Sequence, residues 1–283
     1  MATQSTTFTA ERRQARESVV GVRSSWAGAL PVLSLLWREI VRFYRQPSRV
    51  VGVIASPVLF WIVIGSGFGS SIRAAGSQSY LDYFFPGALI MIVLFTSIFT
   101  MMSVIEDRRE GFLLSVLVAP VSRSVIVLGK VLGGTVLSAA QGLVFLAFAP
   151  FIGIHFGVAQ FFAIALVVAM VAFSLTTLGF AIAWKLNSTQ GFHAIINLLM
   201  IPLWLVSGAL FPLTGASIWV RGLMRANPLT YGVEALRGLL FPASAAAGQF
   251  SVTTAVLVLG IISAVLFVAA FMIANQRSTR AMA

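Results

Sequence analysis

The chain has 283 residues, of which 59% are hydrophobic and only 10% are charged, whereas soluble domains carry about 25% charged residues. Its net charge of +11 comes from Lys and Arg that lie between long apolar runs, a placement that disfavours nucleic-acid binding. The sequence has no Cys and only two His, which excludes disulfides and disfavours a structural zinc site. This composition indicates an all-α integral membrane protein.

Residues 1–29 lack the early apolar core of a secretory signal, so we expect a flexible cytoplasmic N-terminus. Residues 30–49 follow as an interfacial helix, in which apolar and basic side chains recur on opposite faces. The apolar face holds Leu33, Leu36, Trp37, Ile40 and Tyr44, and the basic face holds Arg38, Arg42, Arg45 and Arg49. Such a helix is expected to lie in the membrane interface. The alternative is an ordinary helix packed on a soluble core.

Six apolar stretches are long enough to cross a bilayer as helices, which takes about 20 residues each. They lie near residues 50–68, 84–105, 131–154, 161–184, 192–211 and 252–274. Fifteen of the 19 Lys and Arg fall on the side of these stretches that holds both chain ends. Because cytoplasmic loops are enriched in Lys and Arg, both termini, including the tail at 277–283, are predicted to be cytoplasmic.

The connection at residues 106–123, between the second and third stretches, is charged first and apolar afterwards. Five consecutive charged residues open it: Glu106, Asp107, Arg108, Arg109 and Glu110. Gly111 and an apolar run that ends at Pro120 follow, and this run contains Phe112, Leu113, Leu114, Val116 and Leu117. An apolar patch rimmed by charge is typical of a docking site. The alternative is that these residues extend the neighbouring helices along the membrane surface.

Residues 212–250, on the outer side, contain two short helix-like pieces near 213–226 and 230–240, broken at Asn227 and Pro228. Short apolar helices beside a span are typical of a re-entrant or interfacial hairpin. Glu234 and Arg237 are three residues apart, so they share one helix face. We expect this face to be the watery side of the second piece.

No catalytic or energy-coupling group is expected in the chain. All eight Asp and Glu lie outside or at the edge of the predicted spans, which disfavours a transporter coupled to an ion gradient. The sequence has neither a G-x-S-x-G motif nor a phosphate-binding G-x-x-x-x-G-K-[ST] loop. Gly129 and Gly133, like two other glycine pairs, have the spacing that lets membrane helices approach closely, and their part in dimerisation stays open.

The order of these elements resembles the membrane subunit of type 2 ABC exporters, which include permeases for drugs and for lipid-linked oligosaccharides and polysaccharides. The resemblance covers about residues 30–276 as a single transmembrane permease domain. Its most specific residues lie after the second span and around the outer hairpin. They are residues 106–111, Pro120, Ser122, Gly129, Lys130, Pro212, Asn227, Pro228, Tyr231, Glu234, Arg237 and Gly238.

The resemblance implies that residues 106–123 hold a coupling helix seated in a separate ABC ATPase subunit, which the helix at 30–49 also touches. It implies that ATP and Mg are bound by that partner, and that two permeases, identical or homologous, work with two ATPases in the bacterial inner membrane. The cargo would be an amphiphilic drug, lipid or lipid-linked glycan, which would make drug efflux and antibiotic resistance expected roles. A secondary transporter or channel without an ATPase is the main alternative, followed by a membrane enzyme or scaffold.

Overall fold

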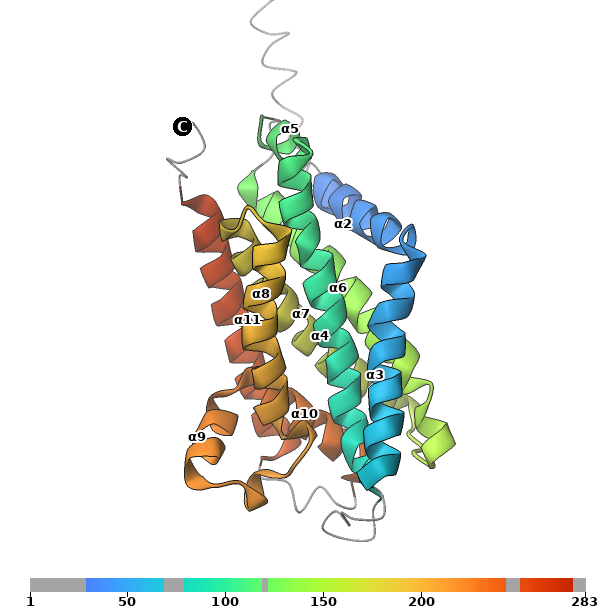
Figure 1. Ribbon diagram of the computed structural model, residues 1–283. Coiled ribbons are helices and arrows are strands. Elements are labelled where there is room, and N and C mark those ends of the chain that lie inside the picture. Colours follow the sequence, from blue (N-terminus) through green and yellow to red (C-terminus); the bar gives the residue numbers. More distant parts are fainter. Residues whose placement is uncertain (1–28, 69–78, 119–121, 243–249, 277–283) are drawn as a thin grey trace, which may run out of the picture.

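The computed structural model describes residues 29–68, 79–118, 122–242 and 250–276, and these residues form helices without any strand. Six helices are long and apolar enough to cross a membrane, as Figure 1 shows. Five of them are α3 (Pro47–Phe68), α4 (Tyr80–Arg109), α6 (Arg123–Leu146), α7 (Val158–Lys185) and α11 (Val252–Asn275). The sixth is α8 (Thr189–Trp204) together with the turn η2 (Leu205–Ala209) that continues it. The predicted all-α membrane fold with six spans is confirmed.

Two helices continue through charged residues that the sequence places outside the spans. Helix α4 continues to Arg109, so four of the five charged residues expected in a loop form its last turn. Gly111 then takes φ +76°, a left-handed conformation that ends helices readily, and the short helix α5 (Phe112–Val118) begins. Helix α6 starts at Arg123, so Lys130, expected just before the third span, lies in its interior.

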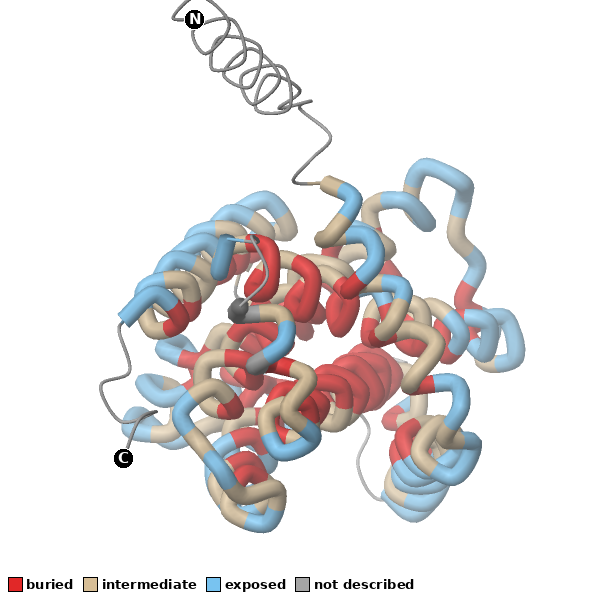
Figure 2. Tube along the Cα trace, turned by 90° about the horizontal axis from the view of Figure 1, so that it is seen from above, coloured by how far each residue is buried: buried red, intermediate tan, exposed pale blue. Residues whose placement is uncertain are grey.

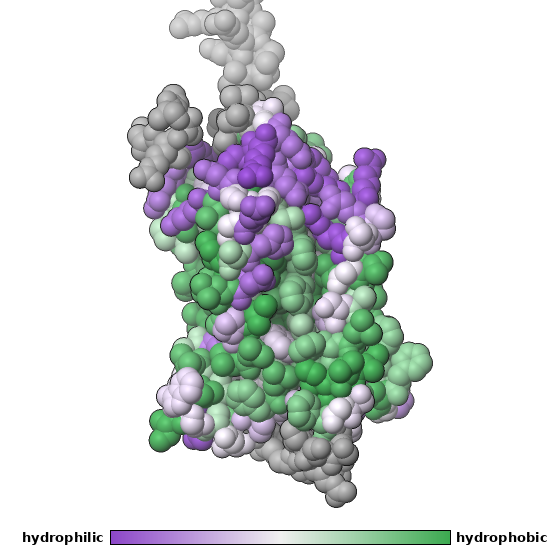
Figure 3. Space-filling model, viewed as in Figure 1, coloured by the Kyte–Doolittle hydropathy of each residue, from purple (hydrophilic) through white to green (hydrophobic). Residues whose placement is uncertain are grey.

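Helix α4 occupies the centre of the bundle. From Tyr83 to Ile105 its side chains are buried except at Met91, Phe95 and Phe99. The view from above shows this buried core surrounded by helices with exposed outer faces (Figure 2). On the face that Figure 3 shows, the middle of the bundle is apolar and the hydrophilic surface gathers at the end that holds α2 and α5. Large apolar side chains of α7 and α11, such as Leu166 and Ile261, are exposed as well. An apolar belt of this kind is what lipid contact requires.

Helix α2 (Ala29–Tyr44) lies obliquely beside the α5 end of the bundle (Figure 1). Its predicted apolar face is exposed at Leu33, Trp37 and Tyr44, as contact with a membrane interface would require. Leu36 and Ile40 are half-buried. A third face, with Leu35 and Phe43, is buried.

A close approach between α2 and α6 depends on a glycine pair. A Cβ atom added at Gly129 would lie 2.7 Å from the Leu35 Cβ, and one at Gly133 would lie 3.0 Å from the Glu39 Cβ. The structure therefore uses this pair for packing inside one chain. Because α2 covers Gly129 and Gly133, these two residues are not free to pack against a second copy of the chain.

Replacing Gly129 with Ala is expected to lower the free energy of unfolding by about 1–3 kcal/mol, because the extra methyl group must push α2 away from α6. Thermal unfolding of the detergent-solubilised chain measures this loss. Gly222→Ala in α9 is the matched control, since a Cβ there meets nothing within 4 Å. Equal unfolding temperatures for Gly129→Ala and the wild type would contradict the close packing of α2.

The opposite end of the bundle carries α9 (Ile218–Ala226) and α10 (Pro228–Leu240). The break at Asn227 and Pro228 is where the sequence predicts it, but the first helix starts at Ile218 rather than near residue 213. Asn227 caps α10 by accepting a hydrogen bond from the Leu229 amide at 3.0 Å. Helix α9 buries only Met224, whereas most of α10 is packed into the bundle.

Candidate functional site

A buried group of charged side chains joins α2, α4 and α6 at the α5 end. The Lys130 Nζ donates to the Glu39 Oε1 at 2.5 Å and to the Ser103 Oγ at 3.1 Å, and it also donates to the Asp107 carboxylate. Glu39, Ser103, Asp107 and Lys130 are each at most 2% exposed. Charged groups this deep are stable only when they are paired and hydrogen-bonded.

Arginines of α2 and α3 complete this arrangement. Arg38 grips Asp107 through two hydrogen bonds of 2.7 and 2.9 Å. Arg42 donates to Asp107 at 2.5 Å and to Glu106 at 2.9 Å, and Arg49 donates to Glu106 at 3.4 Å. We call Arg38, Glu39, Arg42, Arg49, Ser103, Glu106, Asp107 and Lys130 the charge cluster.

The charge cluster gives partners to most of the predicted basic face, for which the sequence predicts none. Three of the arginines expected on that face, at positions 38, 42 and 49, turn toward the last turns of α4, and only Arg45 is exposed and makes no ion pair among the described residues. Hydrogen bonding to Asp107 raises the pKa of the Arg38 guanidinium above its ordinary value. The cation therefore persists at any physiological pH.

Helix α5 contacts the charge cluster through the aromatic ring of Phe112. The Arg38 guanidinium carbon lies 3.6 Å from the centre of the Phe112 ring, a cation–π contact. Leu113 is 4% exposed and packs inward, so it is not part of the exposed patch that the sequence predicts. Ser115 is exposed. The side chains of Leu114 and Leu117 and the whole of Pro120 lie outside the described part of the chain.

Arg108 and Arg109, predicted to rim the docking patch, bind the turn between α7 and α8. Arg108 donates to the carbonyls of Trp184 at 2.6 Å and Leu186 at 3.0 Å, and to the Asn187 side chain at 2.8 Å. Arg109 donates to the Asn187 carbonyl at 3.1 Å. The last turn of α4 is therefore connected to α2 and α6 through Asp107 and to α7 and α8 through Arg108.

The end of the bundle that carries α9 and α10 contains a second buried ion pair. The Arg237 guanidinium donates to the Glu234 Oε1 at 2.7 Å and to the Gly208 carbonyl at 2.9 Å, and its Cζ lies 4.2 Å from the centre of the Tyr83 ring. Glu234 is 6% exposed. The pair thus faces the interior, and the prediction that it lies on the watery side of its helix is wrong.

A break in α8 explains why Arg237 points inward. After Trp204 the helix widens into a π-helical turn, η2 (Leu205–Ala209), in which Gly208 takes φ +83°. Carbonyls at such a break lose their amide partners and need other donors. The Tyr83 hydroxyl donates to the Gly208 carbonyl at 3.1 Å, and the Tyr80 hydroxyl donates to the Leu210 carbonyl at 2.9 Å.

The predicted residues of the outer hairpin have separate partners. The Tyr231 hydroxyl donates to the Arg225 carbonyl at 2.7 Å, which joins α10 to α9. The Asn227 side-chain amide donates to the Leu203 carbonyl of α8. Pro228 is the first residue of α10. The outer hairpin is therefore fastened to α8 and α4 by side chains that the sequence singles out, through contacts that it does not predict.

Sequence reasoning missed Glu39 and Ser103, and it gave Lys130 no partner. One signal for Glu39 was present, since it stands four residues from both Leu35 and Phe43 and hence shares their helix face. A carboxylate on a buried apolar face requires a cation. No comparable signal marks Ser103, which is an ordinary small polar residue within an apolar span.

Comparison with known proteins identifies the family. The family described as ABC-2 type transporter matches residues 31–241. The putative transport permease ycf38 of Cyanophora paradoxa is 31% identical over 214 residues, which cover 72% of each chain. The inner membrane transport permease YadH of Escherichia coli (strain K12) is 28% identical over 77% of this chain and 82% of its own. The daunorubicin resistance ABC transporter permease protein DrrB1 of Streptomyces coeruleorubidus is 22% identical over 83% of this chain and 80% of its own. This chain therefore belongs to the ABC-2 type transporter family and is a multi-pass transport permease subunit.

Proposed function

We propose that this permease is the membrane-spanning subunit of an ATP-driven exporter, in which two permeases work with two separate ABC ATPase subunits. The observation that carries this proposal is the position of α5. This short helix lies at the hydrophilic end of the bundle (Figures 1 and 3) and contacts Arg38 of the charge cluster through Phe112. A single turn at Gly111 connects α5 to the central helix α4. ATP and Mg would be bound by the ATPase, and this chain would bind no cofactor.

In this proposal, movement of α5 reaches every helix that contacts the end of α4. The ATPases close on ATP, displace α5 and thereby pull on the last turn of α4. Asp107 transmits the displacement to α2 and α6, and Arg108 transmits it to the turn between α7 and α8. Buried ion pairs resist stretching because separation would leave unpaired charges in a medium of low dielectric constant. The connected helices should consequently tilt together.

We propose that the α5 end faces the cytoplasm of a bacterial cell and that both termini lie on that side. The distribution of Lys and Arg supports this orientation, since it favours the side of both chain ends. The cargo is an amphiphilic drug, lipid or lipid-linked glycan, and the name of DrrB1 as a daunorubicin resistance permease favours the drug class among these. The second permease is another copy of this chain or a homologue.

Purification of the tagged permease from its native membrane tests the ATPase partner. We expect an ABC ATPase in equal amount, whose ATP hydrolysis depends on the permease. Ser115→Trp should reduce the co-purified ATPase by roughly tenfold, because it places a bulky side chain on the exposed part of α5. Among the described residues, the Ser115 side chain donates a hydrogen bond only to the Gly111 carbonyl within its own turn, so the fold should be preserved.

Ser217→Trp is the matched control, since Ser217 is also exposed, lies at the opposite end and makes no capping hydrogen bond with its side chain. It should leave the ATPase bound. A permease that transports after purification without any ATPase would refute the proposal and favour a secondary transporter.

A further inference from the structure

Between Tyr83 and Ile105, helix α4 has one row of side chains that are not buried. The row consists of Met91, Phe95 and Phe99, which are four residues apart and half-exposed while their neighbours are buried. It faces the space between α3 and α8, which flank α4 in Figure 1. Phenylalanine rings facing outward from a central helix form an apolar floor.

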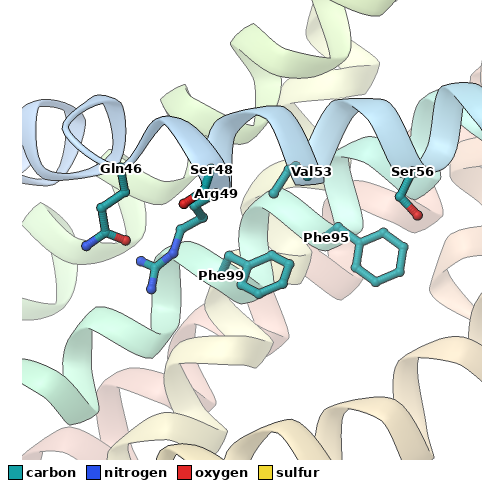
Figure 4. A pocket seen from close by; sticks show the side chains of 8 residues that line it. Gln46, Ser48, Arg49, Val53, Ser56, Phe95 and Phe99 are labelled. Carbon is teal, nitrogen blue, oxygen red and sulfur yellow. The ribbon is translucent and has the colours of Figure 1, made fainter.

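A cavity of about 520 Å³ lies over this floor, between α3 and α4. Phe95 and Phe99 form its base, and Ser56 of α3 lies across from them (Figure 4). Gly52 of α3 also lines the cavity. The volume falls within the range of roughly 300–1,000 Å³ that is typical of small-molecule sites. A Cβ added at Gly52 would meet nothing within 4 Å, so the space over the floor is open at this residue.

Aromatic contacts join α3 and α8 beyond the floor on the α9 side. The Phe60 ring of α3 lies 6.0 Å from the Trp204 ring of α8 and 6.4 Å from the Phe84 ring of α4. The ring centre of His193 of α8 lies 5.7 Å from that of Phe99, so α8 approaches one edge of the floor. A ligand on the floor would therefore lie between α3 and α4, which line the cavity, with α8 close to Phe99.

The other end of the cavity is polar and cationic. Gln46 and Arg49 line it (Figure 4). Among the described residues, Arg49 donates a single hydrogen bond, of 3.4 Å, to the Glu106 Oε1, while Arg42 donates to the other carboxylate oxygen of Glu106. Most of the five donors of the Arg49 guanidinium thus have no acceptor among the described residues, and neither has the Gln46 side-chain amide.

We propose that this cavity binds an amphiphile with one anionic group, such as a carboxylate or a phosphate. The anionic group pairs with Arg49 and Gln46, because guanidinium–oxyanion hydrogen bonds are strong and directional. The apolar body lies on Phe95 and Phe99. Arg45, exposed next to Gln46, repels cations from this end. The site rests on the proposed function, since it would be where the exporter holds its cargo.

Three probes that share one body test the charge preference. They are dansyl-undecanoate, its methyl ester, and the analogue with a trimethylammonium group in place of the carboxylate. Binding is followed by dansyl fluorescence on the full-length permease in phosphatidylcholine nanodiscs without an ATPase. We expect the carboxylate to bind at least tenfold more tightly than the other two. Equal affinities, or a preference for the cation, would overturn the proposal.

Substitutions locate the binding. Arg49→Gln should weaken carboxylate binding about tenfold and leave the ester unchanged, and Arg49→Lys should restore most of the loss. Gly52→Leu, which adds a side chain to the open space over the floor, should weaken all three probes about tenfold. Arg225→Gln, an exposed arginine at the far end, is the control. Unchanged carboxylate binding in Arg49→Gln, or unchanged binding of every probe in Gly52→Leu, would refute the assignment.

Two further arms separate the origin of the ligand from the proposed function. Displacement of the probe by phosphatidylglycerol would identify the anionic amphiphile as a membrane lipid, and its retention would identify a soluble compound. If carboxylate binding holds while no ATPase associates with the permease, the site stands and the exporter function fails. If the ATPase associates but charge preference is absent, the exporter function stands and the site fails.

Discussion

Lys130→Met is expected to lower the free energy of unfolding by about 3–5 kcal/mol, the usual cost of removing one partner from a buried ion pair. The methionine fills a similar volume, so the loss comes from charge and not from a cavity. Glu39 would keep only Ser103 and a 3.6 Å contact with Arg38, and Asp107 would keep its two arginines. Thermal unfolding in detergent, followed by size-exclusion chromatography of the folded fraction, measures the effect.

Two further variants show that the effect arises in the charge cluster. Lys185→Met removes an exposed lysine that makes no ion pair among the described residues and should change stability by less than about 0.5 kcal/mol. The double variant Glu39→Gln with Lys130→Met should be more stable than Lys130→Met alone, because it removes the stranded carboxylate together with its cation. A Lys130→Met protein as stable as the wild type would mean that the cluster contributes nothing to the fold.

Arg237→Met is expected to destabilise the chain by about 3 kcal/mol and to loosen the end that carries α9 and α10, since it leaves Glu234 buried without a cation. It also removes a donor from the Gly208 carbonyl and the cation over the Tyr83 ring. Unfolding in detergent gives the total loss. Faster proteolysis or hydrogen exchange within α9 and α10 would locate it.

Arg225→Met is the matched control for Arg237→Met, because Arg225 is exposed and makes no ion pair with its side chain among the described residues. Glu234→Gln should cost less, about 1 kcal/mol, because the amide oxygen can still accept from Arg237. If Arg225→Met and Arg237→Met lower the free energy of unfolding equally, the buried ion pair does not stabilise the fold.

The sequence predicts the spans well because each is an uninterrupted apolar run, and lipid leaves such a run few structures other than a helix. It predicts helix ends less well where charges occur. We interpret a charged residue at the end of an apolar run as the start of a loop, and the sequence therefore predicts Glu106 and Arg109 outside α4. In the structure their helix continues because Arg42 and the carbonyl of Asn187 supply partners.

Local spacing predicts which residues pair but not which way they face. Glu234 and Arg237 are an ion pair, as their separation of three residues suggests. Their inward orientation depends on the broken end of α8 and on Tyr83, which stands 125 residues from Gly208 in the sequence. Lys130 and Glu39 are 91 residues apart. Contacts between such distant residues depend on how the helices pack, which periodicity within one segment does not report.

The central position of α4 also decides where this permease can change during evolution. A larger side chain at most positions from Tyr83 to Ile105 would collide with neighbouring helices, because almost every residue there is buried. Met91, Phe95 and Phe99 are the exceptions. Along this stretch of the core helix, we therefore expect these three positions to accept a larger side chain without rebuilding the bundle.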